Sequence, residues 1–319
     1  NFYMNKQRIC IVGEGLSGLM SAIAINKLPG IDVSLITKKA SNKIDKRTTA
    51  ISEANLKFLK GNIDQLSSKL FWPSKNIELF YETNKEKINF LNLREKKINL
   101  MYVFENDKIK KVLLKEIAKK KIKIICKKIK NLDELKKYDL PILCLGGNSR
   151  VYDKIIKDRS IIKDYKEIAI TGYVKHSIKN LKSSQFFLKE GPLAILPFCK
   201  DRFSFVWSLN KDFYNINAKD INKIIEDKIL DVLEIKKKIS VSNIQSYPIN
   251  LGLKRQYYNK NILILGEGLH SIHPIAGQGF NLVLRDIKKL KEILKYYSEL
   301  GISIKNSYAL NDFYNSRKP

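Results

Sequence analysis

Two glycine-rich segments, one near each end of the 319-residue chain, carry residue types that hold a dinucleotide. The first, Gly13–Gly18, is a GxGxxG that follows a short apolar run and opens a helix-like run. In such a turn the first glycine permits a tight bend, the second lets a pyrophosphate approach the backbone, and the third lets helix and strand pack closely. Free N–H groups at the helix start then face the phosphates. We therefore predict a dinucleotide site here, with a purely structural glycine turn as the alternative.

The second segment, Gly266–Leu282, follows an apolar run at 261–265 and leads into another helix-like run. It holds His270 and His273, and two histidines at that spacing can share a metal ion. No third ligand is evident in the sequence and Pro274 follows directly, so we predict no metal. The segment is a second place where a helix start can face an anion.

The first glycine turn needs a strand before it and a helix after it, and the sequence supplies both. Residues 8–13 have the pattern of a buried strand, 16–28 of a helix and 31–36 of a second strand, which together make a βαβ unit. The second strand of such a unit usually ends in Asp or Glu, which binds the ribose hydroxyls. Here Thr37, followed by two lysines, offers one neutral hydrogen bond. A basic residue at this place also suits the 2′-phosphate of NADP, which leaves that cofactor open.

Beyond this unit the hydrophobic pattern changes along the chain. Helical spacing occurs at 49–60, 105–120, 218–235 and 279–297, and strand-like runs occur at 77–82, 98–104, 122–126, 140–145 and 261–265. Between about 166 and 210, alternating or aromatic-rich strands follow one another with turns between them. We therefore predict an α/β fold with a Rossmann-like framework and an inserted antiparallel β-sheet, whose core includes Phe205 and Trp207.

The charge balance is strongly basic, with 60 Lys+Arg against 32 Asp+Glu and a formal net charge of +28. The basic residues are mostly lysines spread along the whole chain, without a zinc-finger spacing or an RNA-binding aromatic motif. We therefore predict no nucleic-acid partner. An anionic membrane surface suits such a charge, because a lysine near anionic lipid contributes roughly 1 kcal/mol.

The four cysteines form no CxxC pair, and two of them, Cys10 and Cys144, lie inside apolar runs. We expect reduced, buried thiols in a cytoplasmic protein. No run approaches the ~18 apolar residues of a membrane span, and no signal peptide is visible. Because the first residue is Asn1, we expect the natural start at Met4 or upstream.

The stretch His273–Leu282 resembles a pattern of the ubiquinone-biosynthesis hydroxylases, which are flavoprotein monooxygenases of the para-hydroxybenzoate hydroxylase type. That pattern is His-Pro, then Ala-Gly-Gln-Gly, then Asn-Leu, and it follows a Gly-Asp-Ala-Ala-His that Gly266–His270 matches in part. Further family-like segments are Asp45–Ala50, Gly191–Pro197, Phe205–Ser208 and Tyr247-Pro248, so the resemblance covers nearly the whole chain. The family's closing helices are expected to follow Tyr308–Lys318.

The resemblance implies FAD as the cofactor, with NAD(P)H or another reductant as the electron donor. Arg47 would contact the phosphate and ribityl side, Glu267 would reach the ribityl hydroxyls, and Pro274 would line the oxygen-reacting face. Gly277 and Gly279 would let backbone N–H groups approach the flavin ring, at a helix start that stabilises negative charge. The implied cofactor-binding residues are Gly13, Gly15, Leu16, Ser17, Gly18, Arg47, Glu267, Gly277, Gln278, Gly279 and Asn281.

The implied fold is α/β, a Rossmann-like FAD-binding domain with an inserted antiparallel β-sheet substrate domain. The first would comprise 1–75, 100–165 and 245–319, and the second 76–99 and 166–244. The implied function is an FAD-dependent monooxygenase that uses O₂ to hydroxylate the aromatic ring of a polyprenylated phenol in ubiquinone biosynthesis. Such a protein is expected in the cytoplasm, peripheral at the inner membrane and in a quinone-biosynthesis complex.

Three acidic cofactor contacts of that family are altered here. Thr37 replaces one, Leu145 replaces a second, and Glu267 stands where the family has Asp. Each hydrogen bond lost to a charged group costs about 1.5–3 kcal/mol, which would weaken FAD binding. A non-catalytic flavin-fold accessory protein of a quinone-biosynthesis complex is therefore the alternative function. A flavin reductase or halogenase is a third reading, although the halogenase lysine and aromatic signatures are not evident.

Overall fold

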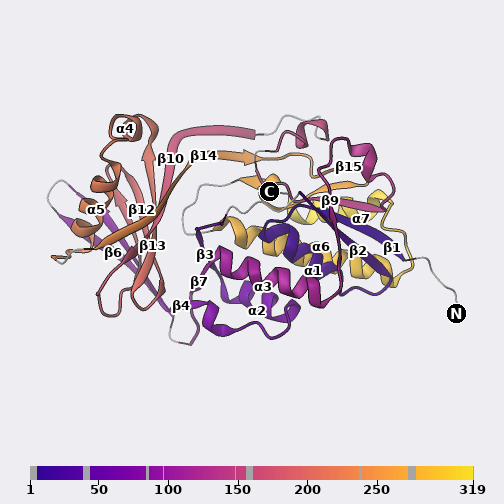
Figure 1. The fold of residues 1–319 in the computed structure, drawn as a ribbon, viewed down its shortest axis with the longest axis horizontal. Coiled ribbons are helices and arrows are strands. Elements are labelled where there is room, and N and C mark those ends of the chain that lie inside the picture. The colour runs from indigo at the N-terminus through magenta and orange to yellow at the C-terminus, as the bar shows by residue number, and fades with distance from the viewer. Residues whose placement is uncertain are drawn as a thin grey trace.

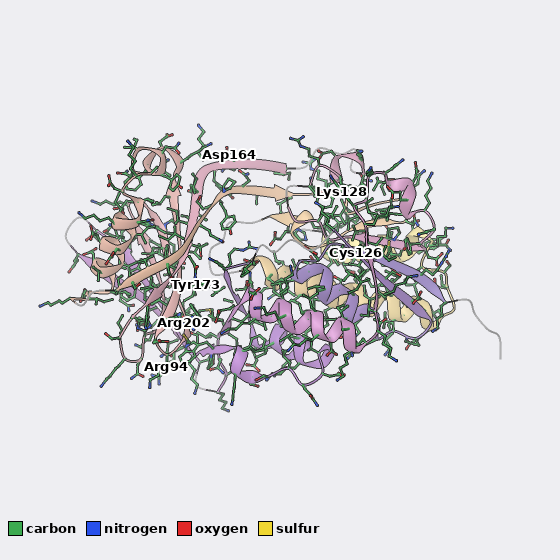
Figure 2. The ribbon with its side chains drawn as sticks, viewed as in Figure 1. Arg94, Cys126, Lys128, Asp164, Tyr173 and Arg202 are labelled. Carbon is green, nitrogen blue, oxygen red and sulfur yellow. The ribbon has the colours of Figure 1, made fainter. Side chains whose placement is uncertain are left out.

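The computed structural model describes residues 6–38, 44–83, 86–95, 97–147, 149–155, 161–236, 239–271 and 278–318. Two large sheets lie at opposite ends of the long axis, and two long strands, β10 (Ile161–Lys175) and β14 (Ser240–Leu253), run from one toward the other (Figure 1). The register between these strands shifts between Asp164 and Glu167, and Asp164 lies at the bend of β10 (Figure 2). The chain therefore has the expected α/β architecture.

The first sheet is mainly parallel and has the order β15-β16-β9-β1-β2-β8. Its strands have continuous apolar runs because helices pack against the sheet and bury them. The carboxyl ends of its central strands meet at one edge, which brings Gly13, Cys144 and Leu265 together. The elements are β1 (Gln7–Val12), β2 (Ile31–Thr37), β8 (Lys123–Cys126), β9 (Leu140–Leu143), β15 (Tyr258–Asn259), β16 (Ile262–Ile264), α1 (Leu16–Ile25), α3 (Asn106–Lys119), α6 (Gln278–Glu299) and α7 (Ser307–Arg317).

The second sheet, called the outer sheet below, has the order β17-β14-β10-β13-β12-β11-β5-β6. Its neighbouring strands are antiparallel except for β11 and β5, which are parallel. Phe205 and Trp207 are buried in the core between one face of this sheet and α5, as predicted. The remaining elements are β5 (Asn76–Glu82), β6 (Lys87–Arg94), β11 (Ser183–Leu188), β12 (Gly191–Cys199), β13 (Arg202–Asn210), β17 (His270–Ser271), α4 (Lys211–Ile216) and α5 (Ile221–Val232).

A small three-stranded sheet, β3-β7-β4, joins the two halves. Its residues Met101 and Val103 pack against Tyr173 and Leu196 on the other face of the outer sheet. This contact covers only part of that face. The elements are β3 (Thr48–Ile51), β4 (Trp72–Ser74), β7 (Met101–Glu105) and α2 (Glu53–Asn62), with short 3-10 turns η1 (Ser68–Leu70), η2 (Leu132–Leu135), η3 (Tyr152–Lys154) and η4 (Gly266–Gly268).

Some sequence predictions were wrong in detail. The helix expected at 218–235 begins only at Ile221, and a separate helix, α4, precedes it. The helix expected at 49–60 begins at Glu53, because the Ser52 side chain caps it and Thr48–Ile51 pairs with β7 instead. Strand β6 and most of β14 were not predicted.

All four cysteines are free, and Cys10 and Cys144 are buried as expected. Burial raises the pKa of each of these two thiols to about 12, so both are protonated at neutral pH. Within the described ranges, no helix has both the length and the apolar character that a membrane crossing requires.

Candidate functional site

A cavity of about 400 Å³ lies where the glycine turn of α1, the start of α6 and the outer sheet meet. Six of the predicted cofactor-binding residues line it: Gly15, Leu16, Ser17, Arg47, Glu267 and Gly279. The outer sheet contributes an apolar wall opposite them, formed by Ala169, Leu196, Val206 and Ile249. The cavity thus has the glycine turn at the start of α1 on one side and an apolar surface on the other.

The three glycines of the first turn have different surroundings. A β-carbon on Gly13 would lie 2.1 Å from the Cys144 carbonyl oxygen, and one on Gly18 would lie 2.1 Å from the Gly13 carbonyl oxygen. No side chain fits at either position, so these two glycines allow α1 to pack closely against the strands β1 and β9. Among the described residues, no atom lies within 4 Å of a β-carbon on Gly15, and Gly15 caps the start of α1 without a side-chain hydrogen bond. The open space beside α1 is therefore where an anion can reach the helix N–H groups.

Arg47 lies at the cavity with its guanidinium already paired. Its Nε and Nη2 atoms each donate to one oxygen of Asp45 over 2.8 Å, and its Cζ atom lies 5.4 Å from the centre of the Tyr247 ring. Burial alone would raise the pKa of Asp45, but the hydrogen bonds and charge of Arg47 hold it below its usual value. The site therefore presents a fixed ion pair over an aromatic ring. No pattern in the sequence indicated that Asp45 would pair with Arg47 or that Tyr247 would line the cavity.

Glu267 is exposed on the turn η4, and the buried Tyr152 side chain packs against this turn at Gly268. The buried Tyr152 hydroxyl accepts a hydrogen bond from the Leu145 N–H at 2.9 Å. A β-carbon on Gly268 would lie 2.5 Å from the same hydroxyl oxygen. Tyr152 thus holds both loops that follow β9 and β16, a role that no motif in the sequence signalled.

The Asn281 side chain, predicted as a cofactor contact, makes hydrogen bonds within the chain. Its side-chain oxygen accepts from the Ser52 N–H at 3.0 Å and from the Asn55 amide at 2.6 Å, and its amide donates to the Ala50 carbonyl at 2.9 Å. These bonds fix α6 against β3 and the start of α2. Asn281 therefore positions the helix start instead of lining the cavity.

His270 lines the cavity and is backed by a buried acid. Its Nε2 atom lies 3.6 Å from an oxygen of Asp286, whose other oxygen accepts from Arg317 Nε at 2.5 Å. Burial lowers the pKa of His270, against the opposing charge of Asp286. Burial also raises the pKa of Asp286, although Arg317 and His270 oppose that shift. Among the described residues, no group of three potential ligands could hold a metal ion.

Asp286 and Arg317 were missed in the sequence. The one available signal was that Asp286 interrupts an apolar helical stripe formed by Val283, Ile287 and Leu290. A charged residue at such a position needs a buried partner. Nothing in the sequence indicated that Arg317, at the end of α7, would be that partner.

The two residues that replace family acids, Thr37 and Leu145, lie at the ends of strands or directly after them. Thr37 ends β2, is only 8% exposed and contacts Cys126 Sγ across 3.9 Å through its hydroxyl. Figure 2 shows Cys126 on the side of the first sheet that carries β8. Leu145 follows β9 and packs partly into the core. Neither position offers a carboxylate to a ribose.

Three predicted site residues, Pro274, Gly277 and Gln278, are not described by the structure or are described only in part. Pro274 and Gly277 fall outside the described residues, as does His273, and the side chain of Gln278 is not described. Gly279, at the start of α6, borders the cavity, and a β-carbon there would meet no atom of the described residues within 4 Å. The described residues leave space for FAD beside Gly15 and Gly279, and they lack the ribose-binding carboxylate at Thr37.

Comparisons with known proteins agree with this geometry. A family model described as squalene epoxidase matches residues 209–319. The ubiquinone hydroxylase UbiL of Rhodospirillum rubrum is 29% identical over 160 residues, covering 49% of this chain and 37% of that protein. The mitochondrial ubiquinone biosynthesis monooxygenase COQ6 of Schizosaccharomyces pombe is 24% identical over 210 residues, covering 50% of this chain and 44% of that protein. The chain therefore matches less than half the length of each of these relatives.

Solved structures show the fold. The p-nitrophenol 4-monooxygenase PnpA of Pseudomonas putida superposes with a TM-score of 0.78 at 14% identity, covering 98% of this chain and 85% of that one. The flavin-dependent halogenase CmlS superposes with a TM-score of 0.76 at 12% identity, covering 99% of this chain and 63% of that one. The expected resemblance is confirmed: the chain is a relative of the ubiquinone-biosynthesis FAD-dependent hydroxylases and has the fold of the flavoprotein monooxygenases.

Proposed function

We propose that this chain is an FAD-dependent monooxygenase that hydroxylates the aromatic ring of a polyprenylated phenol in ubiquinone biosynthesis. The observation that carries the proposal is the pair of open glycines, Gly15 and Gly279, which face one cavity from two helix starts. Space at both positions is what a bound dinucleotide requires and what packing alone does not explain. The names of the curated relatives support the substrate class.

In this proposal the residues of the chain bind, orient and exclude water. The start of α1 binds the diphosphate, and Arg47, held by Asp45, lies beside it. Bound FAD would supply the redox chemistry with O₂, after reduction by NAD(P)H or another donor. The apolar wall of Ala169, Leu196 and Val206 would hold the aromatic ring and keep water away from the reacting atoms.

The domain division, the cofactor roles and the location belong to the same proposal. Residues 1–75, 100–165 and 245–319 would form the FAD-binding domain, and 76–99 with 166–244 the substrate domain. Gly13, Gly18, Leu16, Ser17, Glu267, Gly277, Gln278 and Pro274 keep the roles implied by the resemblance. The protein would act in the cytoplasm at the surface of the inner membrane, in contact with other quinone-biosynthesis proteins.

The test is complementation of a bacterium that lacks one ubiquinone ring hydroxylase, using the full natural reading frame. We expect the wild-type chain to restore ubiquinone in one such strain and Gly279→Val to fail, since its side chain would occupy the flavin position without disturbing the fold. Ubiquinone would be measured in lipid extracts, with the soluble level of each protein as the control.

Thr37 and Leu145 favour the alternative function, a non-catalytic accessory protein, because both lack the acid that binds FAD in the family. That alternative predicts failure in every single-deletion strain, together with co-purification with another quinone-biosynthesis protein. Titration of apoprotein with FAD gives an independent result. No binding at high micromolar FAD would remove the cofactor from the proposal.

A further inference from the structure

An exposed apolar strip lies at the free edge of the outer sheet, formed by Tyr81 on β5 and by Ile88, Phe90, Leu91 and Leu93 on β6. Their exposed fractions are 56%, 42%, 53%, 42% and 42%, respectively. Cross-strand pairing sets Leu79 opposite Leu91, Ile77 opposite Leu93 and Tyr81 opposite Ile88, which puts these side chains on one face. Five large apolar side chains on one face of an edge are more than the scattered exposure of an ordinary surface.

Phe90 belongs to the same face. It occupies the irregularity of β6 between the residues opposite Leu79 and Phe80, and its ring centre lies 6.0 Å from that of Phe187. Phe187 pairs with Tyr81, so its side chain shares the face of the strip. The strip therefore extends onto β11.

The strip lies on the same face of the outer sheet as the cavity wall. Following directly opposed residues across the strands, one row runs through Thr171, Val206, Ala194, Gln185, Leu79 and Leu91. The neighbouring row holds the pair Ala169 and Ser208 at one end and the run Pro192, Phe187, Tyr81 and Ile88 at the other. Thr171, Val206 and Ala169 line the cavity. Five strand spacings separate the two ends, or roughly 24 Å.

Charged groups surround the strip without interrupting it. The β5 carboxylates Glu78 and Glu82 alternate to the opposite face, where they lie 2.6 Å from Lys182 Nζ and 3.9 Å from Lys228 Nζ. Exposed basic residues flank the strip at Lys75, Arg94, Lys97 and Lys189, and Figure 2 shows Arg94 at the end of the outer sheet. Two exposed acids, Glu86 and Glu95, also lie at the ends of β6, but the basic residues outnumber them. An apolar surface with a mainly basic border matches the interface of an anionic bilayer.

A second copy of the chain fits this surface less well. Two β6 strands paired antiparallel in full register would set Lys87 of one opposite Arg94 of the other, and like charges directly opposed are destabilising. Two molecules of net charge +28 also repel each other, whereas anionic lipid attracts both.

We propose that the apolar strip is the membrane-docking surface of this protein and that its partner is an anionic lipid bilayer. Docked there, the outer sheet offers one continuous face from the bilayer to the cavity. The strip would hold the isoprenoid tail of an amphipathic substrate in lipid, on the same sheet face as the cavity, with Ala194 and Gln185 buried between the two. This last point rests on the proposed function, while docking itself does not depend on flavin chemistry.

The test is co-sedimentation with vesicles made of equal parts phosphatidylglycerol and phosphatidylcholine. The variants are Leu91→Glu, Phe90→Glu and the uncharged Leu91→Ser. The matched controls are Ile216→Glu and Tyr308→Glu, which lie outside the strip, are 83% and 67% exposed, and change the net charge by the same amount. We expect each strip variant to lower vesicle partitioning about tenfold and the controls to change it less than twofold.

If the strip variants and the glutamate controls lost vesicle partitioning equally, the proposal would be overturned, because only the net charge of the protein would then attract it to the vesicles. Unchanged partitioning of all strip variants, or no vesicle binding by the wild type, would also overturn it. Self-association that Leu91→Glu abolishes, without vesicle binding, would assign the strip to a second copy. FAD titration of the same preparations, together with their melting temperatures, separates these results from misfolding and from failure of the proposed function.

Discussion

Gly15 differs from its two neighbouring glycines in what a side chain would meet. Its backbone has φ −74° and ψ 173°, an extended conformation that valine adopts readily, and the space beside its Cα atom is open. Gly13 has φ +135° and a backbone oxygen in the way of any β-carbon. Substitutions at the two sites should therefore separate cofactor binding from folding.

We predict that Gly15→Val melts like the wild type but binds FAD at least about a hundredfold more weakly, because the side chain would displace the diphosphate from the helix N–H groups. Gly13→Val should instead lose about 2 kcal/mol or more of unfolding free energy. Flavin fluorescence titration and thermal melting measure the two effects. Wild-type FAD affinity in Gly15→Val would place the cofactor elsewhere.

His270 makes the stability of the fold depend on pH. Its pKa is lowered by burial, whereas the unfolded chain takes up this proton near pH 6.5. Below that pH the unfolded state binds more protons than the native state, so the free energy of unfolding falls as pH falls, by at most about 1.4 kcal/mol per pH unit.

We predict that His270→Gln loses less stability than the wild type between pH 7.5 and pH 5.5, measured by urea unfolding. The raised pKa of Asp286 has the opposite sign, because an acid that keeps its proton more readily when folded favours the native state at low pH. Asp286 is present in both proteins, so its effect largely cancels in the comparison. Identical losses would show that His270 does not contribute.

At the scale of elements, a buried ion pair between Asp286 and Arg317 holds α7 against α6. Asp286 is fully buried, Arg317 donates to it at 2.5 Å, and the Arg317 carbonyl accepts from the Tyr257 hydroxyl at 3.0 Å. The Tyr257 ring contacts His270 on β17 and Tyr314 on α7, so Tyr257 links α7 to β17. The far end of the chain thereby supports the cavity wall at His270.

Arg317→Ala should cost about 3 kcal/mol of unfolding free energy, since it leaves a buried carboxylate without its partner. Adding Asp286→Asn to that variant should recover part of the loss, because the uncompensated charge is then gone. Lys318→Ala, one residue further on and exposed, serves as the control. The measurement is chemical denaturation of all four proteins. A loss no larger than that of Lys318→Ala would contradict the role of the pair.

At the scale of the whole molecule, the net charge of +28 gives the protein a long-range attraction to anionic surfaces. Added salt shortens the screening length from ~10 Å at 0.1 M to ~3 Å at 1 M. Wild-type partitioning onto phosphatidylglycerol-containing vesicles should therefore fall at least about tenfold over that range. Equal partitioning onto neutral vesicles would argue against the electrostatic contribution.

The sequence by itself determined the elements whose formation depends on residues that are close together in the chain. The glycine turn before α1 was predicted because its glycine spacing and the helix start that follows it lie within a few residues, and α6 was predicted from its apolar stripe. The alternating and aromatic-rich runs of β11, β12 and β13, with turns between them, indicated an antiparallel sheet for the same reason.

Only the tertiary structure decided which distant residues meet. Tyr247 reaches Arg47 because β14 pairs with β10 over most of its length, and a strand register is set by cross-strand packing that no local pattern records. Asn281 was assigned to the cofactor from its motif, yet its hydrogen bonds go to β3 and α2, which lie more than 200 residues earlier in the chain. The Arg317–Asp286 pair likewise depends on how two helices pack, because a buried charge is stable only where packing supplies its partner.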